Sequence, residues 1–349
     1  MEWPSMNIKR SLPDFCTSYH DAVRAELEKV IDSSPSALRN MLRYHMGWQD
    51  EHGCPCRGES GKFIRPTLCL LSCEAVGGDT SQAMPVAAAV ELIHSFSLIH
   101  DDIEDASYDR HHRPAVWRLW GQPQAINAGD AMFALAYQAL LKLKEKGIAD
   151  DKIAISTRML SLACLELCEG QYLDLEYENR LDITVDDYLG MAAKKTAALL
   201  AVSTALGAYV SSEYSRVVDS LHLFGRELGM AFQIRDDIMG IWGMEENTGK
   251  SAGDIPRRKK TLPVVYGLQH SAGKGKASLQ KLYAQEFIVG EDIAEVKRVL
   301  ERSGARAYAE NLAEQHYHRA LAQLEATGLD SSRKAPLKEI ACFLLKRDF

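Results

Sequence analysis

Three aspartates near residue 100 are the side chains in this sequence best suited to chemistry. Asp101 and Asp105 follow the apolar stretch that begins at Ala87, and on a helix they share one face, with Asp102 beside them. Stability alone does not favour this arrangement, because a helix C-terminus carries partial negative charge and two carboxylates about 6 Å apart repel by roughly 3 kcal/mol at an effective dielectric constant of about 20. Mg²⁺ would relieve both effects, since it binds one or two protein carboxylates together with substrate phosphates. The alternative for one such motif is a solvated acidic helix end.

A second apolar helix also runs into adjacent carboxylates. Residues Phe224 to Gly240 read FGRELGMAFQIRDDIMG, which brings Asp236 and Asp237 to the end of that helix. A lone pair of aspartates would count for little. Two acidic helix ends in one domain suggest instead two walls of one cavity, and they indicate a diphosphate bound through metal ions.

Basic residues occur where such an anion would need them. Lys62 and Arg65, in GKFIRP, lie at the junction between a loop and a helix, where free backbone N–H groups also favour anions. By themselves they would usually form a solvated face. His94 faces the same way as Asp101 along its helix, although a lone buried histidine is more often a core residue than a ligand.

Two further basic segments follow. Lys194 and Lys195 interrupt an apolar helix, and we expect Lys194 to be exposed and Lys195 to face inward, where a buried lysine requires an anion. A charged loop next to the second acidic helix would usually be solvated, but in an acidic protein its place beside two carboxylate clusters favours a diphosphate clamp. This loop contains Lys250, Asp254 and the run Arg257-Arg258-Lys259-Lys260.

The composition is that of an ordinary globular protein and limits the choice of partners. Of 349 residues, 46% are hydrophobic and 26% charged, and the formal net charge of -7 argues against a nucleic-acid partner. The longest apolar run, Thr196 to Val210, is shorter than the roughly 20 residues that span a bilayer, and the segment MEWPSMNIKR lacks the apolar core of a signal peptide. The eight cysteines show no zinc-binding pattern. We therefore expect a reduced, soluble, cytoplasmic protein without a transmembrane segment.

Helical periodicity dominates the sequence, and no segment reads convincingly as a strand. Ser34-Pro35 predicts an N-cap and a first-turn proline for the helix that follows, and Thr184 with Asp187 predicts a capping box. Neither charge nor composition shifts enough to mark a domain boundary. We predict one all-α domain over residues 1–349, a helical bundle of about a dozen helices in which residues 1–35 form an N-terminal helix and arm.

Taken in order, these motifs resemble the trans-isoprenyl diphosphate synthase (polyprenyl synthetase) family, and within it the short-chain geranylgeranyl diphosphate synthase type. The resemblance runs from about residue 40 to the C-terminus through GKFIRP, ELIHSFSLIHDDIED, Arg110 with Pro114, NAGD, GQYLD, KKT, FQIRDD and GKSAGD…KKTLP. It implies an all-α bundle with a deep central cavity, usually a homodimer. Such an enzyme condenses isopentenyl diphosphate with an allylic diphosphate and uses Mg²⁺, which we expect as three ions.

The resemblance also implies a role for each matching residue. The Mg²⁺ ligands would be Asp101 and Asp105 on one wall and Asp236 on the other, with Asp102 and Asp237 in support. The residues that hold the allylic diphosphate would be Lys195, Arg110, Lys250 and Lys259, and Lys195 would form the catalytic group with Thr196 and Gln233. The residues that hold isopentenyl diphosphate would be Lys62, Arg65 and His94.

The sequence departs from the family pattern at two places. The second acidic motif usually ends in a further aspartate, where this chain has Gly240; we expect weaker metal binding at most, with Asp254 as a compensating residue. The second arginine of a pair that contacts isopentenyl diphosphate is replaced by His111, which lowers the expected affinity for that substrate unless Arg113 substitutes.

We predict a Mg²⁺-dependent trans-prenyltransferase that makes a short-chain product. The alternative is a class I terpene cyclase on the same scaffold, which Gly240 and His111 favour slightly. Lys62, Arg65 and His94 oppose it more strongly, because a cyclase has no use for an isopentenyl site. A third possibility is a non-catalytic partner subunit, which the intact DDIED motif opposes, since a subunit without catalysis would not need so costly a cluster.

Product length is expected to depend on the residues one to two turns before Asp101. Phe96 and Ser97 lie roughly 6 to 7.5 Å from Asp101 along the helix axis, and side chains tilt toward the helix N-terminus. A phenyl ring at Phe96 would obstruct a growing chain, whereas Ser97 would obstruct little. In the resembling family this arrangement is typical of enzymes that stop at geranylgeranyl diphosphate, with farnesyl diphosphate the next expectation. The alternative is that Phe96 is a core aromatic that points away from the cavity.

Overall fold

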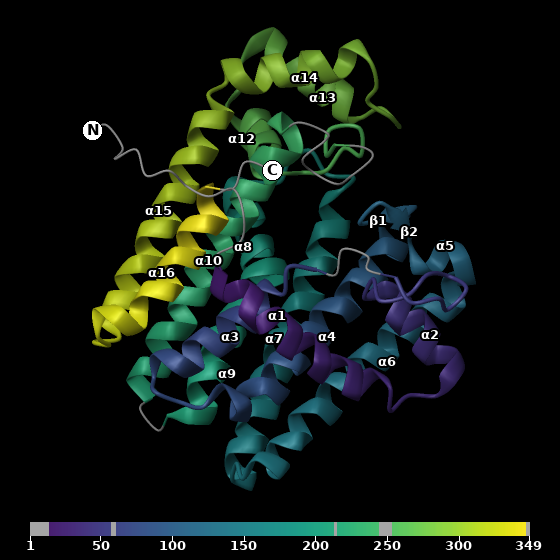
Figure 1. Ribbon diagram of the computed structural model, residues 1–349. Coiled ribbons are helices and arrows are strands. Elements are labelled where there is room, and N and C mark those ends of the chain that lie inside the picture. The colour runs from purple at the N-terminus through teal and green to yellow at the C-terminus, as the bar shows by residue number, and fades with distance from the viewer. Residues whose placement is uncertain (1–13, 57–60, 213–214, 244–252, 347–349) are drawn as a thin grey trace.

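The computed structural model describes residues 14–56, 61–212, 215–243 and 253–346, and these residues are predominantly helical (Figure 1). The helices confirm the predicted all-α fold. They are α1 (Asp14–Ile31), α2 (Ser36–His45), α3 (Ile64–Ala75), α4 (Thr80–Glu104), α5 (Val116–Trp120), α6 (Gln122–Leu141), α7 (Asp150–Tyr177), α8 (Val185–Ala192), α9 (Ala198–Ser211), α10 (Ser215–Trp242), α12 (Leu262–His270), α13 (Gly273–Tyr283), α14 (Glu291–Arg302), α15 (Ala305–Ala326) and α16 (Ser331–Lys346). A 3₁₀ turn η1 (Lys142–Lys146) and a π-helical turn η2 (Ala193–Ala197) join some of them, and the short strands are β1 (Asp109–Arg110) and β2 (Arg113–Pro114).

The two helices that end in carboxylates, α4 and α10, lie at the centre of the bundle. α4 packs along α3, α6 and α9, while α10 packs along α9 and α15. α9 contacts both, and its residues from Ala198 to Ala208 are all buried. Figure 1 shows α15 and α16 on one side of the bundle and α6, with α2 and α5, on the other. The shared helix α9 therefore fixes how the two acidic helices lie relative to one another.

β1 and β2 form an antiparallel hairpin that the helical periodicity did not predict. The strands pair Arg110 with Arg113, and the two residues between them, His111 and His112, have φ angles of 49° and 58°. Positive φ at both positions is what a two-residue type I′ turn requires, although glycine and asparagine are the usual residues there. Because the hairpin follows α4 after a few residues, it returns the chain toward the acidic end of that helix.

Of the two predicted helix caps, one is confirmed and one is wrong. At α8 the Thr184 hydroxyl accepts from the Asp187 backbone N–H at 3.1 Å and the Asp187 carboxylate accepts from the Thr184 N–H at 2.9 Å, which is a capping box. At α2 the N-cap residue is Pro35 itself. The Ser34 hydroxyl instead donates to the Ile31 carbonyl at 2.6 Å and so satisfies the end of α1.

Two helical stretches are long and apolar enough to cross a membrane by length and composition alone. They are Thr80–Glu104, which is α4, and Val185–Ser211, which runs through α8, η2 and α9. Their most apolar windows are 67% and 72% buried inside the fold. Packing against neighbouring helices therefore accounts for their apolar character.

Glycines bring helices together at distances that a side chain would prevent. A Cβ atom on Gly207 of α9 would lie 1.9 Å from the Cys69 carbonyl oxygen of α3. A Cβ atom on Gly225 of α10 would lie 2.6 Å from the Leu200 carbonyl oxygen of α9. Both neighbours are backbone atoms in helices, so neither can move aside cheaply, and the crossings of α9 with α3 and α10 depend on these glycines.

Replacing Gly207 with alanine should therefore destabilise the protein by more than about 2 kcal/mol, because the added methyl group forces α3 and α9 apart. Gly190→Ala is the matched control, since a Cβ there meets nothing within 4 Å in helix α8. That control should raise stability by about 0.5 to 1 kcal/mol. Urea unfolding followed by circular dichroism measures both, and equal stabilities for the two variants would contradict the packing argument.

Candidate active site

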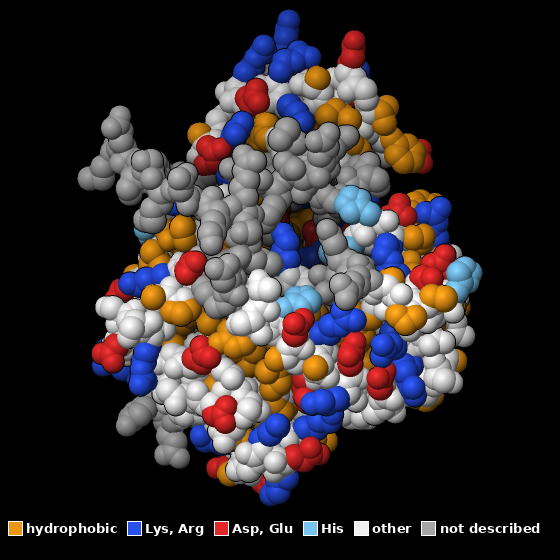
Figure 2. All heavy atoms as spheres, viewed as in Figure 1, with side chains coloured by type: hydrophobic (Ala, Val, Ile, Leu, Met, Phe, Trp, Pro, Cys, Tyr) orange, Lys and Arg blue, Asp and Glu red, His pale blue; other side chains and the backbone are white. Residues whose placement is uncertain are grey.

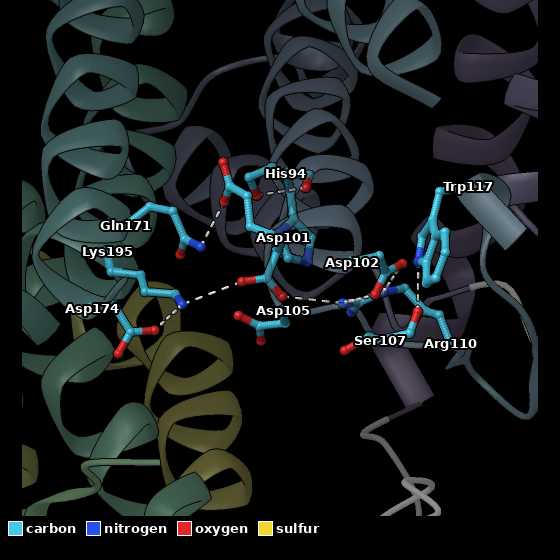
Figure 3. A network of polar contacts seen from close by, with 12 residues as sticks. His94, Asp101, Asp102, Asp105, Ser107, Arg110, Trp117, Gln171, Asp174 and Lys195 are labelled. Carbon is cyan, nitrogen blue, oxygen red and sulfur yellow. Dashed lines mark hydrogen bonds and ion pairs between the residues drawn. The ribbon is translucent and has the colours of Figure 1, made fainter. Parts of the chain in front are cut away.

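Cations from three separate segments surround the acidic end of α4, and Figure 3 shows two of them, Lys195 and Arg110. Asp101 contacts Lys195 Nζ at 3.3 Å and Arg110 Nη2 at 3.3 Å. Asp102 accepts from Arg110 Nε at 2.8 Å and Nη2 at 2.7 Å, and Asp105 accepts from Lys259 Nζ at 2.7 Å. The structure thus brings together the predicted metal ligands of the first motif and three of the predicted phosphate-binding cations.

The pKa shifts of Asp101, Lys195 and Lys259 favour their ionised forms, whereas burial raises the pKa of Asp102. Burial alone would raise the pKa of Asp101, but Lys195, Lys259 and Arg110 together lower it to about 2. Burial would likewise lower the pKa of Lys195 and Lys259, yet the neighbouring aspartates raise both above the ordinary lysine value. The side chains of Asp101, Arg110 and Lys195 keep 21%, 22% and 24% of their surface accessible. Figure 2 shows that one face of the molecule is hollowed near its centre, with basic and acidic side chains visible inside.

The π-helical turn η2, which packs between two helices, positions Lys195. Lys194 points to Glu169, whereas Lys195 Nζ donates to Asp174 Oδ2 at 2.5 Å as well as to Asp101, as the inward orientation predicted for it requires. A Cβ on Gly170 of α7, in the motif GQYLD, would lie 2.1 Å from the Lys195 backbone nitrogen. The close approach of α7 thus holds the turn at the position where it presents lysine to the acidic end. Single π-turns inside helices are often found at functional sites.

The second acidic end is organised differently from the first. Asp237 is buried, and its two carboxylate oxygens accept from the Tyr188 hydroxyl at 2.5 Å, the Leu262 N–H at 2.8 Å and Gln233 Nε2 at 2.8 Å. Gln233 Oε1 in turn accepts from the Thr196 hydroxyl at 2.6 Å, so these two predicted catalytic residues lie together. Burial raises the pKa of Asp237 to about 7.

These hydrogen bonds affect which of the predicted aspartates can bind a metal ion. Both oxygens of Asp237 are engaged by protein donors, so Asp237 holds Gln233 and the start of α12, which is compatible with the supporting role expected of it. Asp102 is engaged in the same way by the Arg110 guanidinium. Asp236 directly precedes Asp237 and is only partly buried. We keep Asp101, Asp105 and Asp236 as the candidate ligands.

The proposed isopentenyl site contains two residues that sequence reasoning missed. Burial lowers the pKa of His94, and the charges of Arg65, Arg110, His45 and His111 lower it further, which places these side chains near one another. His45, at the end of α2, has its pKa lowered to about 3 by burial and by the charges of Arg110, His111 and Arg113. In the sequence, His45 is marked only as a polar residue directly before a loop.

Glu91 is the second missed residue. It lies on α4 one turn before His94, it is buried, and burial raises its pKa to about 7 against the opposing charge of Arg65. A Cβ on Gly61 would lie 3.9 Å from Glu91 Oε1, so the start of GKFIRP packs on this carboxyl group. Lys62, the next residue, is exposed. The entrance to α3 therefore presents one exposed and one partly buried cation beside two neutral histidines.

Arg113 does not take the place of the missing arginine. Its guanidinium donates to the Tyr44 and Gln49 carbonyls at 3.1 and 2.7 Å, and it lies over the Tyr44 ring at 4.0 Å. These contacts hold the hairpin against α2 and the loop that follows it. The predicted substitution of Arg113 for His111 is therefore wrong, and His111 remains the residue at that position of the hairpin.

The basic loop is not a solvated charge run. Each of its four basic side chains has a specific acceptor: Arg257 Nη1 reaches the Ser107 hydroxyl at 3.2 Å, Arg258 Nη1 the Gln285 carbonyl at 2.7 Å, Lys259 Nζ the Asp105 carboxylate at 2.7 Å and Lys260 Nζ the Glu178 carbonyl at 2.8 Å. Lys250 lies outside the described residues. Only Lys259 of the run contacts a predicted metal ligand, which agrees with the role proposed for it.

Phe96 belongs to a cluster of aromatic rings between α4 and α6. Its ring centroid lies 5.5 Å from that of Phe133, and Phe133 lies 5.1 Å from Tyr137. Ser97 donates its hydroxyl to the His94 carbonyl at 2.8 Å. Two further rings that sequence reasoning did not identify therefore extend the aromatic contacts of Phe96.

Comparisons with known proteins agree with this arrangement. Residues 56–302 match the family model described as Polyprenyl synthetase. The chain is 36% identical over 343 residues to a (2E,6E)-farnesyl diphosphate synthase of Mycobacterium tuberculosis, covering 97% of this chain and 94% of the relative. It is 39% identical over 325 residues to a geranylgeranyl diphosphate synthase of the same species, covering 92% and 90%.

Solved structures give the same result. A polyprenyl synthetase from Streptomyces coelicolor superposes with a TM-score of 0.87 at 34% identity, over 95% of this chain and 99% of the other. A geranylgeranyl pyrophosphate synthetase from Pyrococcus horikoshii superposes with a TM-score of 0.85 at 32% identity, over 96% and 98%. The match of family, sequence and fold over most of the chain establishes that this protein belongs to the polyprenyl synthetase family and is a prenyltransferase of the trans-isoprenyl diphosphate synthase class.

Proposed function

We propose that this enzyme condenses isopentenyl diphosphate with an allylic diphosphate in a Mg²⁺-dependent reaction, with geranylgeranyl diphosphate as the principal product. The observation that carries the proposal is the position of Asp101 between Lys195 and Arg110. Each of these cations holds a carboxylate at a contact distance of 3.3 Å and keeps part of its surface accessible. Each can therefore exchange that carboxylate for a phosphate oxygen.

The residues fit Mg²⁺ as the cofactor. Oxygen ligands are what Mg²⁺ prefers, and it usually keeps several waters and takes substrate phosphates instead of a complete protein cage. In keeping with this, the described part of the chain holds no group of three or more acidic, histidine or cysteine side chains that could bind an ion by itself. Asp101 and Asp105 would supply ligands from α4, and Asp236 from α10. Bound Mg²⁺ would stabilise the negative charge that develops on the departing diphosphate.

The protein's own residues have clear tasks in such a reaction. Lys195, Arg110 and Lys259 bind the allylic diphosphate and favour departure of the leaving group through their fixed positive charges. Thr196 and Gln233 hydrogen-bond one another beside that lysine. The apolar helices keep water away from the allylic cation, which the double bond of isopentenyl diphosphate then attacks with loss of a proton.

The grouping around His94 favours two substrates over one. A terpene cyclase ionises a single diphosphate and needs no second anion site, yet Arg65, His45 and His111 all lie within electrostatic range of His94. The direct contacts of Asp101 with two cations also fit a catalytic chain better than a non-catalytic partner subunit.

Incubation of the purified protein with Mg²⁺, farnesyl diphosphate and labelled isopentenyl diphosphate tests the function directly. We expect label to enter a longer prenyl diphosphate, and chelation of Mg²⁺ with EDTA to abolish that incorporation because the charge on the leaving group is no longer stabilised. Release of a cyclic hydrocarbon without incorporation of label would identify a cyclase instead. Absence of any turnover would identify a partner subunit.

Product length should respond to Phe96. The relatives include enzymes named for farnesyl and for geranylgeranyl products, and the ring at Phe96, backed by Phe133, supports a stop at the twenty-carbon chain. Phe96→Ala should shift products to longer chains with little change in the first condensation, because the ring nearest to Asp101 is removed. The control is Phe287→Ala, whose exposed ring lies on the loop between α13 and α14. Chromatography of the dephosphorylated products decides; an unchanged length distribution in Phe96→Ala would place the obstruction elsewhere.

We also propose that the enzyme is a homodimer. Large apolar side chains recur at helical spacing and are exposed on α6 and α7: Ile126, Phe133, Leu141, Ile155, Leu162 and Leu165. A stripe of this kind on two adjacent helices is typical of an interface. All cysteines that the structure describes are free, which supports the cytoplasmic location that we propose for the enzyme.

Leu165→Glu should convert the dimer to a monomer, because it places a charge in the proposed interface. Phe287→Glu is the matched control, since both side chains are 66% exposed and Phe287 lies far along the chain from α6 and α7. Sedimentation velocity measures the mass of each. A wild-type protein that sediments as a monomer, or a Leu165→Glu variant that remains a dimer, would contradict the interface.

A further inference from the structure

Backbone strain is concentrated at the candidate site. In the part of the chain that the structure describes, five non-glycine residues have positive φ angles, a conformation that costs free energy when a Cβ atom is present. Each directly follows or precedes a residue of the candidate site, and they are Phe63, Ala106, His111, His112 and Arg258. Such strain persists only where the surrounding structure holds it, and it is often found at functional sites. Arg258, with a φ angle of 55°, directly precedes Lys259.

The turn that contains Arg258 requires this left-handed conformation. The Arg258 N–H donates to the Ile255 carbonyl at 2.9 Å, and the Lys259 N–H donates to the Asp254 carbonyl at 3.0 Å. These two hydrogen bonds form the Schellman pattern, in which the residue at the position of Arg258 is usually glycine. An arginine at this position therefore needs a side-chain contact that compensates for its backbone conformation.

That contact joins the turn to the end of α13. Arg258 Nη1 donates to the carbonyl of Gln285 at 2.7 Å, two residues after Tyr283 ends the helix. On the other side of Lys259, the Lys260 ammonium lies 5.1 Å from the centre of the Tyr283 ring. Both neighbours of Lys259 are thus anchored to the C-terminal end of α13.

The side chain of Lys259 points the other way. Its Nζ donates to Asp105 at 2.7 Å, at the end of α4, whereas α13 contacts α12 and α14 at one end of the molecule (Figure 1). Ile255 of the same turn is buried in a core cluster with Leu279 and Leu282 of α13. The end of α13 therefore supports the turn from behind, and Lys259 is directed from that support toward the acidic end of α4.

We propose that Arg258 is a positioning residue, whose guanidinium holds the turn to the end of α13 and so aims the Lys259 ammonium at a diphosphate bound beside Asp105. The inference rests on the proposed function, which places a magnesium diphosphate next to Lys259. Among the described residues, Arg258 makes no ion pair with an aspartate of α4. Its effect on the site therefore passes through Lys259.

Isothermal titration with inorganic diphosphate in saturating Mg²⁺ measures this effect without any turnover. Arg258→Gly removes the guanidinium but suits the left-handed backbone, so the fold should survive, and circular dichroism confirms that it does. The affinity of this variant for magnesium diphosphate should fall about tenfold, which is the scale of coupling between neighbouring residues. Arg319→Gln is the control for the loss of one positive charge, since Arg319 is exposed on α15, and it should bind as wild type does.

A double-mutant cycle with Lys259 separates positioning from a loss of charge or of structure. If Arg258 acts through Lys259, Arg258→Gly should change the affinity by less than about twofold in a chain that already carries Lys259→Ala. A direct electrostatic effect of the guanidinium, or general damage to the loop, would persist in that background. Wild-type binding by Arg258→Gly overturns the proposal, and so does an equal loss of affinity with and without Lys259→Ala.

The outcome is also independent of prenyl transfer. If the cycle shows coupling but the wild-type protein makes no prenyl product, the proposed function fails while the role of Arg258 stands. If wild-type protein elongates farnesyl diphosphate and Arg258→Gly binds normally, the proposed function stands and the role of Arg258 is refuted. Wild-type protein that does not bind magnesium diphosphate would overturn both.

Discussion

Charge balance at the end of α4 is the constraint on which the rest of the structure depends. Carboxylates removed from water are costly unless opposite charges stand close by. The cations that neutralise Asp101, Asp102 and Asp105 come from β1, η2 and the loop before α12, three segments that are distant in sequence. Folding must therefore bring these segments to one place, and the geometry that balances these charges also assembles the groups proposed to bind a diphosphate.

Backbone contacts through glycine give this assembly its rigidity. Gly170 lets α7 pack on the backbone of η2 from one side. Gly229 lets α10 pack on it from another, where a Cβ atom at position 229 would lie 2.6 Å from the Ala197 Cα. Because backbone contacts hold η2 on two sides, this turn cannot rotate. The direction in which it presents the Lys195 side chain is therefore fixed before substrate binds. Preorganised charge of this kind stabilises a transition state without the reorganisation that flexible side chains require.

Sequence reasoning identified the features that short stretches of sequence encode. It missed those that depend on distant segments meeting in the fold. The two acidic helix ends, the inward Lys195 and the all-α fold follow from periodicity, spacing and charge, which are readable in short windows. His45 and Glu91 could not be found in that way, because a polar residue in a helix becomes significant only when the neighbours that bury it are known. The same holds for Arg113: its type suggested an anion site, whereas its contacts with the Tyr44 ring and two backbone carbonyls assign it to holding the hairpin. The His111-His112 turn was missed because it lacks the glycine and asparagine that usually signal a two-residue type I′ turn.

The pairing of Lys195, Arg110 and Lys259 with carboxylates has a consequence for selectivity among the anions of the cell. A diphosphate without a metal ion must compete with Asp101 and Asp105 for these cations, and a metal ion without a diphosphate must compete with the cations for the aspartates. In the function proposed above, each ligand would relieve the competition that the other faces, so the two would bind with positive thermodynamic coupling, which is reciprocal. Free phosphate compounds that arrive without Mg²⁺ gain no such assistance. The ion pairs of the resting site thereby discriminate against abundant metal-free anions without any steric gate.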